Sequence, residues 1–200
     1  RLFTMGYDAE AGLDTVWCLD ATSGQEVWSH TYPAKIWNHL HGGGTLGTPT
    51  LDGTALYSLN REGKAFRFDA ASGEVQWELD AAEAFGATPG TWGFAASPLV
   101  LGDELILNAG KLVCLDKASG ELLWETGDYG HSYSTPTPFE LEGDLEGVLG
   151  LAVFNGSGLA ILDRTSGEEL GFHEWKTKYD INAASPIVLG DQVFISSGLN

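Results

Sequence analysis

Asp69-Ala-Ala-Ser-Gly73, with Trp77 four residues beyond it, is the stretch of sequence that decides the fold, because the chain repeats it. The same pattern occurs at 20–24, 116–120 and 163–167, so that successive aspartates lie 49, 47 and 47 residues apart. A regular period of this length is typical of repeat proteins, in which each unit packs against its neighbours. We therefore expect a chain of similar units.

Each copy of the repeat predicts a β-hairpin. An apolar run reaches the aspartate and a second run leaves the glycine, as in 66–68 and 75–77. Glycine supplies the positive φ that closes such a loop, and the aspartate can accept hydrogen bonds from backbone N–H groups two residues later. The tryptophan on the outgoing strand can pack on a neighbouring unit. We interpret these residues as structural rather than catalytic. The set comprises Asp20, Gly24, Trp28, Asp69, Gly73, Trp77, Asp116, Gly120, Trp124, Asp163 and Gly167.

A second, less regular hairpin precedes each of these. It begins at a Thr-Pro or Ser-Pro step, at 48–49, 97–98, 135–136 and 185–186. Proline suits the first residue of a strand, where the missing N–H does no harm. Each unit therefore contains four short strands, and no stretch is long and periodic enough to predict a helix. The fold class is all-β, and four-stranded units at this period match propeller blades.

The repeat resembles the tryptophan docking motif of the PQQ-like (quinoprotein-type) β-propellers, Ala-x-Asp-x-x-Thr-Gly-x-x-x-Trp. The resemblance covers nearly the whole chain, which is also similar to the BamB-like bacterial envelope proteins of that superfamily. The fourth copy departs from the motif, because Gly171 stands where the tryptophan should be. We expect a weaker contact between blades there, taken over by Phe172 or Trp175.

The resemblance implies a propeller of four-stranded antiparallel blades, of which residues 1–200 form a part. Residues 1–32 are expected to be three strands of one blade, 48–80, 97–127 and 134–173 whole blades, and 185–200 the start of another. Propellers of this family have seven or eight blades, so the chain covers about four blades of a longer ring. Residues 1–5 and 192–196 both read as second strands, an overlap that disfavours a closed four-bladed ring. A dimer that completes one ring is the alternative.

Charge and cysteine positions exclude several other classes. The chain has 28 acidic and 10 basic residues, a net charge of −18. We expect no nucleic-acid binding, because that needs clustered Lys and Arg. No apolar stretch approaches the roughly 20 residues of a membrane helix, so direct membrane insertion is not expected. Cys18 and Cys114 occupy the same motif position in units that are not adjacent, which places them too far apart for a disulfide.

The loops that precede the proline strands are the candidate binding site. In a propeller these loops cross from the outer strand of one blade to the inner strand of the next, and they gather around the central channel. Their aromatic and amide groups suit a sugar, a peptide or a flat cofactor. The candidate ligand-binding residues are His39, His41, Trp92, Phe94, His131, Tyr133 and Asn182.

Each candidate has a structural alternative. His39 and His41 have a spacing compatible with metal ligation, but no third ligand recurs nearby, and no metal site is predicted. Trp92 and Tyr133 can equally be lids over the core, and His131 can be hydrogen-bonded to its own loop. The acidic runs at 8–10 and 140–146 read as solvated surface rather than calcium loops, because neither has the spaced ligands of such a loop.

Two functions follow from the resemblance. The first is a non-catalytic binding or scaffold module of the bacterial cell envelope, periplasmic or extracellular, that presents one face to a protein, peptide or glycan and needs no cofactor. The alternative is a dehydrogenase that uses PQQ and calcium to oxidise an alcohol or sugar, with an aspartate as base. The chain lacks the adjacent Cys-Cys pair of the family's alcohol dehydrogenases, and only Asp180 and Asn182 approach a calcium cluster. No Gly-x-Ser-x-Gly elbow is present, so no catalytic residue is predicted.

Overall fold

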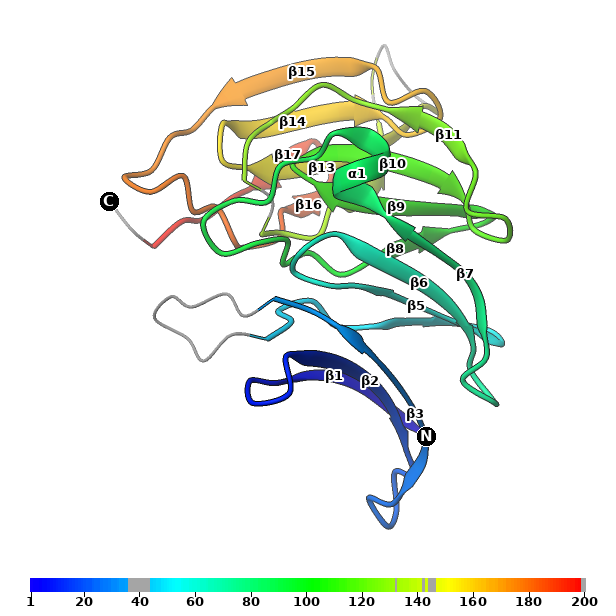
Figure 1. Ribbon diagram of the computed structural model, residues 1–200. Coiled ribbons are helices and arrows are strands. Elements are labelled where there is room, and N and C mark those ends of the chain that lie inside the picture. Colours follow the sequence, from blue (N-terminus) through cyan, green and yellow to red (C-terminus); the bar gives the residue numbers. More distant parts are fainter. Residues whose placement is uncertain (36–43, 132, 142, 144–146, 199–200) are drawn as a thin grey trace.

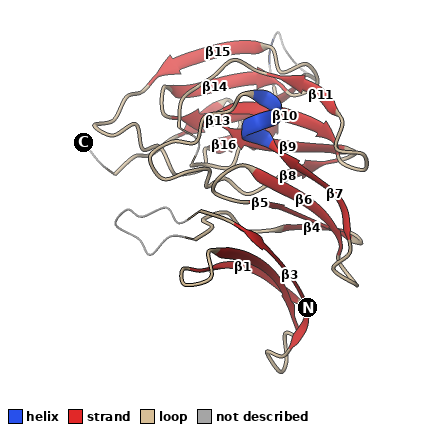
Figure 2. Cartoon of the chain, in the orientation of Figure 1, coloured by secondary structure: helices blue, strands red, loops and turns tan. Residues whose placement is uncertain are grey.

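The chain folds into antiparallel sheets that follow one another along the sequence (Figures 1 and 2). The computed structural model describes residues 1–35, 44–131, 133–141, 143 and 147–198. Figure 1 shows the sheets stacked in a curved array, from the N-terminal sheet to the C-terminal hairpin. The prediction of an all-β fold built from four-stranded antiparallel units is confirmed.

The strands fall into five groups within the described residues. The first sheet has three strands, β1 (Leu2–Asp8), β2 (Leu13–Leu19) and β3 (Glu26–Pro33). Three four-stranded sheets follow, each with its strands in chain order. They are β4 (Thr50–Asp52), β5 (Ala55–Leu59), β6 (Lys64–Asp69) and β7 (Val75–Asp80); β8 (Leu99–Leu101), β9 (Glu104–Ala109), β10 (Lys111–Asp116) and β11 (Leu122–Glu125); and β12 (Thr137–Glu140), β13 (Leu149–Asn155), β14 (Gly158–Asp163) and β15 (Glu169–Glu174). The last sheet is the hairpin of β16 (Ile187–Leu189) and β17 (Gln192–Phe194).

One short helix, α1 (Ala81–Phe85), corrects the expectation that the chain has none. It lies in the loop between the second and third sheets (Figure 2). Asp80 caps its N-terminus by accepting hydrogen bonds from the backbone N–H groups of Ala82 at 3.0 Å and Glu83 at 3.1 Å. Gly86 ends it in the left-handed conformation, with φ 63°. Five residues make little more than one turn, which is too short for a 3.6-residue hydrophobic period to be visible in the sequence.

The repeated Asp-x-x-Ser-Gly segments are the turns between the third and fourth strands of the sheets. In the second sheet, Asp69 Oδ1 accepts hydrogen bonds from the backbone N–H of Ala71 at 3.1 Å, and from the N–H and hydroxyl of Ser72 at 2.8 Å each. The N–H of Gly73 donates to the Asp69 carbonyl at 2.8 Å, and Gly73 has φ +78°. This is an Asx-turn closed by glycine, and the other three copies repeat it.

The tryptophan of one sheet packs on the turn glycine of the next. A Cβ atom added to Gly73 would lie 2.6 Å from Cδ2 of Trp28, and the Trp28 indole N–H donates to the Ala70 carbonyl at 3.2 Å. Trp77 makes the equivalent hydrogen bond to the Lys117 carbonyl at 3.2 Å. The glycine therefore serves two purposes, because it closes its own turn and leaves room for a neighbouring indole ring.

Alternate residues of the inner strands face opposite neighbours, which gives each pair of adjacent sheets its own core. On β5, Leu56 packs between the first and second sheets, whereas Tyr57 packs between the second and third. On β9, Leu105 faces the second sheet and Ile106 faces the fourth. All four side chains are fully buried. The molecule is thus held together by a series of cores between sheets, as expected of propeller blades.

The fourth sheet has no tryptophan at the docking position, and the two predicted substitutes make different contacts. Phe172, 44% exposed, turns back and stacks on Tyr129 with ring centroids 6.1 Å apart. Trp175, 40% exposed, donates its indole N–H to the hydroxyl of Ser197 at 3.0 Å, beyond β17. Of the two predicted substitutes, Trp175 is the one that contacts the segment of the next sheet.

The two cysteines are free and buried, as their positions predict. Cys18 packs between the first and second sheets, and Cys114 between the third and fourth. Burial raises the pKa of the Cys114 thiol to about 12. Because the thiolate is the reactive form, this cysteine is expected to be inert in the folded protein.

The Asx-turns predict a loss of stability in acid. Hydrogen bonds from Ser72 lower the pKa of Asp69, and those from Ser119 lower the pKa of Asp116. A carboxyl whose pKa is lowered on folding stabilises the protein above its unfolded pKa, and this contribution is lost as the pH falls toward the folded pKa. We expect the free energy of unfolding, measured by urea titration, to fall as the pH drops below about 4. Asp69→Asn should flatten this dependence, and an unchanged pH profile would contradict the assignment.

Candidate functional site

The loops between sheets and the turns between second and third strands lie at the same end of the sheets, which we call the crossover face. The Asp-x-x-Ser-Gly turns lie at the opposite end. Backbone hydrogen bonds tie the crossover face together: the N–H of Phe94 donates to the Arg61 carbonyl at 2.9 Å, and the N–H of Gly156 donates to the His131 carbonyl at 2.9 Å. This face contains the predicted binding residues that the structure describes.

Buried asparagines link neighbouring sheets across the crossover face. Asn108 and Asn155 exchange side-chain hydrogen bonds, at 2.7 Å from Asn108 Nδ2 to Asn155 Oδ1 and at 3.0 Å in return. Asn60 Nδ2 donates to Asp14 Oδ2 at 3.1 Å. All three asparagines are at most 1% exposed. Sequence reasoning missed them, although their positions repeat with the period of the blades.

The first two sheets meet in a buried polar cluster. Asp14 is 2% exposed, and burial raises its pKa. Its Oδ2 accepts hydrogen bonds from Asn60 and from the hydroxyl of Thr45 at 3.1 Å, whereas its Oδ1 has no partner among the described residues. Arg61 is 3% exposed, and its Nε and Nη2 likewise have no partner there. Buried groups of this kind are costly unless they are satisfied.

Three predicted residues come together on the crossover face. The Tyr133 hydroxyl accepts a hydrogen bond from the Trp92 backbone N–H at 3.4 Å, and the rings of Tyr133 and His131 lie 6.0 Å apart. Both rings lie against Gly90, where an added Cβ would be 2.6 Å from His131 Cγ and 2.8 Å from the Tyr133 hydroxyl. Trp92 is half-buried. His39 and His41 lie outside the described residues.

Two further predicted residues are buried in structural positions. Phe94 is 1% exposed and belongs to the core between the second and third sheets. Asn182 is fully buried, and its Nδ2 donates to the carbonyls of Asn155 at 2.7 Å and Trp175 at 3.1 Å. Burial also raises the pKa of Tyr133, which is 8% exposed. These side chains offer a ligand little surface, so their role in binding remains a prediction.

A polar pocket of about 130 Å³ lies beside this group. Ser157, His131 and Asp180 line it and are the residue types of a hydrolase triad. However, no hydrogen bond joins the three side chains in the described part of the chain. The pocket is also smaller than the roughly 300–1,000 Å³ of typical small-molecule sites. It therefore has neither the connections of a triad nor the volume of a cofactor site.

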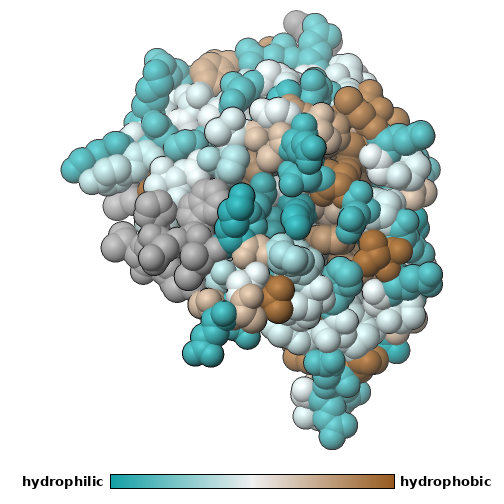
Figure 3. Space-filling model, viewed as in Figure 1, coloured by the Kyte–Doolittle hydropathy of each residue, from teal (hydrophilic) through white to brown (hydrophobic). Residues whose placement is uncertain are grey.

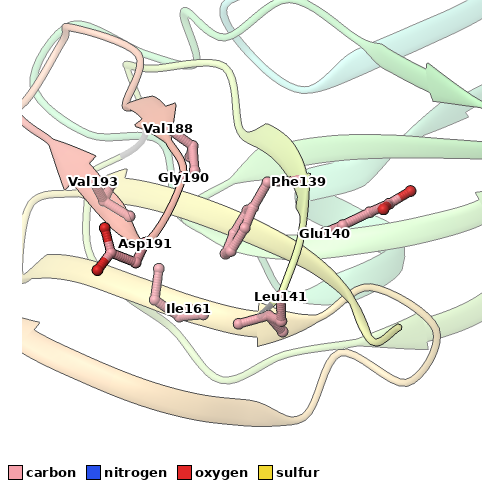
Figure 4. A pocket seen from close by; sticks show the side chains of 8 residues that line it. All are labelled: Phe139, Glu140, Leu141, Ile161, Val188, Gly190, Asp191 and Val193. Carbon is pink, nitrogen blue, oxygen red and sulfur yellow. The ribbon is translucent and has the colours of Figure 1, made fainter. Parts of the chain in front are cut away.

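An apolar cavity of about 230 Å³ lies between the fourth sheet and the last hairpin. Figure 4 shows Phe139, Leu141, Ile161 and Val193 converging on it from β12, its following loop, β14 and β17. Val188 adds to the same lining. The position matches that of the cores between the preceding sheets, so we regard the cavity as packing space between blades.

The sequence profile of the family described as outer membrane protein assembly factor BamB matches residues 12–200. The chain belongs to this family. No curated protein sequence matches it. Among solved structures, BamB from Moraxella catarrhalis matches with 19% identity and a TM-score of 0.59, over 96% of this chain and 55% of that protein. The chain thus spans about half the length of this relative.

Quinoprotein dehydrogenases share the fold of the BamB family. Quinohemoprotein alcohol dehydrogenase from Comamonas testosteroni matches with 13% identity and a TM-score of 0.61, over 91% of this chain and 37% of that one. Quinohemoprotein alcohol dehydrogenase ADHIIG from Pseudomonas putida HK5 matches with 13% identity and a TM-score of 0.55, over 84% of this chain and 33% of that one. At these identities the likeness concerns the fold alone. Among the described residues, no helix has the length and apolar character needed to cross a membrane.

A PQQ cofactor would need a calcium ion, and calcium takes six to eight oxygen ligands. Within the described ranges, no three His, Cys, Asp or Glu side chains lie close enough to hold a metal ion. Asp180 is exposed, and Asn182 is buried, with its Nδ2 donating to two carbonyls and its Oδ1 without a partner among the described residues. These two side chains alone fall short of the six to eight oxygen ligands.

Proposed function

We propose that this chain is part of a non-catalytic β-propeller that binds a protein partner in the bacterial cell envelope. The observation that carries the proposal is that polar side chains of the crossover face are buried in hydrogen bonds within the protein. Asn108, Asn155 and Asn182 are all buried there and bond to one another or to backbone carbonyls. Their hydrogen bonds link neighbouring segments of the crossover face, and this structural use supports a non-catalytic role.

The family supports the same reading. The matching family is described as outer membrane protein assembly factor BamB, and this description supports a protein partner and an envelope location for the chain. A net charge of −18 disfavours nucleic acids and anionic lipid surfaces and favours a partner with basic groups. Peptides and glycans are further ligands that a propeller face could accept, and the periplasm is the compartment we propose.

The alternative function is a quinoprotein dehydrogenase, and one experiment separates the two. The full-length protein is mixed with PQQ and calcium chloride, and absorbance and dye reduction are followed with an alcohol or sugar as substrate. We expect no stoichiometric quinone binding and no substrate-dependent dye reduction. Stoichiometric binding with turnover would overturn the scaffold proposal.

A further inference from the structure

A cleft of about 460 Å³ lies between the end of β3 and the second sheet, where α1 forms part of its wall. Tyr32 and Pro33 line it from β3, and Lys64 and Phe66 from β6. The rest of the lining comes from β7 and the loop that follows it: Glu78, Leu79, Asp80 and Glu83. We call it the acidic cleft. Its volume falls within the range of ligand-binding pockets.

Two carboxylates in the acidic cleft are free to bind a cation. Glu78 and Glu83 are exposed, and their side chains make no hydrogen bond or ion pair with other described residues. Asp80 is committed to capping α1. The one basic residue of the lining is Lys64, whose Nζ donates to the Pro33 carbonyl at 3.2 Å and lies 5.7 Å from the centroid of the Tyr32 ring. Three carboxylates against one ammonium group leave the lining with a net negative charge.

Apolar groups form the inner wall of the acidic cleft. Pro33 is exposed and Leu79 is half-buried, whereas the rings of Tyr32 and Phe66, with centroids 4.7 Å apart, are 6% and 2% exposed and add little surface. The stems of arginine and lysine pack along apolar surfaces while their charged heads reach polar groups. Lys64 shows that an ammonium group is accommodated beside the Tyr32 ring. Carboxylates together with apolar groups are the complement of a long basic side chain.

The wall made by α1 does not belong to the repeat. Among the described loops between sheets, only this one contains a helix, and its cap at Asp80 fixes the turn that carries Glu83. Figure 3 shows hydrophilic and hydrophobic residues side by side in the region of α1 and the adjacent parts of β6 and β7. Because blade packing recurs without such a helix elsewhere, packing does not require this one. Because α1 occurs in this loop and forms part of a charged cleft, we interpret it as an element for binding a partner at this position.

We propose that the acidic cleft accepts an arginine or lysine side chain from a basic segment of the protein partner, and this proposal rests on the binding function above. The chain's net charge of −18 attracts such a segment. The apolar wall, chiefly Pro33 and Leu79, holds the aliphatic stem, and Glu78 and Glu83 pair with the charged head. The contact adds a specific anchor to the general attraction between an acidic protein and a basic partner.

The test is a nuclear magnetic resonance titration of the full-length protein with the peptide acetyl-Gly-Ser-Arg-Ser-Gly-amide. We expect saturable shifts of the backbone amides around Phe66 and Glu78–Glu83. The same peptide with citrulline in place of arginine keeps the shape and loses the charge, and it should produce no saturable shifts. Equal binding of the citrulline peptide, or shifts located elsewhere, would overturn the proposal.

Two double variants separate local pairing from the overall charge. Glu78→Gln with Glu83→Gln should weaken arginine-peptide binding about tenfold or more, because charge-assisted hydrogen bonds are lost. Glu121→Gln with Glu168→Gln removes the same charge from exposed turns at the other end of the sheets, and it should change affinity less than about twofold. Equal weakening in both double variants would mean that the overall charge of the protein, and not the acidic cleft, attracts the peptide. This result would overturn the proposal.

A free cation tests whether the acidic cleft binds a protein side chain or a small cation. Methylguanidinium should bind at least about tenfold more weakly than the arginine peptide, because it lacks the stem that packs on the apolar wall. Equal affinity would make the cleft a site for small cations and overturn the protein-segment assignment. None of these outcomes depends on quinone binding, so failure of this inference and failure of the scaffold proposal are distinguishable.

Discussion

Replacing Gly73 by alanine is expected to lower the free energy of unfolding by about 2–5 kcal/mol. Gly73 has φ +78°, a conformation that costs an alanine roughly 1–2 kcal/mol. The new Cβ would also lie 2.6 Å from Cδ2 and 2.8 Å from Cε3 of Trp28. Overpacking of this kind adds about 1–3 kcal/mol, because the indole ring must move from its place between the first two sheets.

Gly24→Ala is the matched control for this prediction. Gly24 occupies the same position of the motif with φ +72°, but an added Cβ would meet no atom within 4 Å. Its cost should be limited to backbone strain, about 1–2 kcal/mol. Urea titration of both variants, followed by tryptophan fluorescence, gives the difference that belongs to Trp28. If the two variants lose equal stability, packing of the Trp28 indole does not require a glycine at position 73, and the docking interpretation fails.

The hairpins could be predicted from the sequence because their determinants are local. Asp69 and Gly73 lie within one turn, and the chemistry that closes the turn is contained in five residues. The partner of the glycine could not be predicted in the same way. Trp28 reaches Gly73 from the preceding unit, and a repeat period gives the spacing of units without giving their contacts.

Helix α1 escaped prediction for a different reason. Its cap at Asp80 and its end at Gly86 are ordinary signals, but they enclose only five residues. The acidic cleft depends on this helix and on the approach of β3 to β6. In the sequence, Glu78 is one of 28 acidic residues, and no local pattern distinguishes it from the others. Only tertiary packing brings it to the acidic cleft.

The crossover loops contributed less to the site than their composition predicts. Aromatic and amide residues there suggested ligand contacts, but Phe94 and Asn182 are buried and packed. Composition does not distinguish an aromatic that lines a channel from one that fills a core. A better signal was the recurrence of asparagine at positions 60, 108 and 155, because a buried polar residue at each period implies a shared hydrogen bond.

The amide pair of Asn108 and Asn155 is expected to make a strongly coupled contribution to stability. Asn155→Leu leaves Asn108 Oδ1 without its donor at 3.0 Å, whereas the Gly110 carbonyl loses one donor at 3.0 Å and keeps the Tyr129 N–H as another. An unsatisfied buried polar group costs about 1–3 kcal/mol, so we expect a loss of this size. Asn108→Leu should cost a similar amount, since it leaves Asn155 Oδ1 unpaired and frees the Ser134 carbonyl.

The double variant Asn108→Leu with Asn155→Leu is the decisive measurement. Removing both amides leaves neither side chain unsatisfied, so the double loss should be smaller than the sum of the single losses by about 1–3 kcal/mol. Gln25→Leu, at an exposed turn, is the control for replacing an amide by leucine and should change stability by less than about 0.5 kcal/mol. Additive single losses in urea titrations would mean that the two amides act independently. The amide pair would then not act as a joint between the third and fourth sheets, and the non-catalytic assignment of the crossover face would lose the structural role on which it rests.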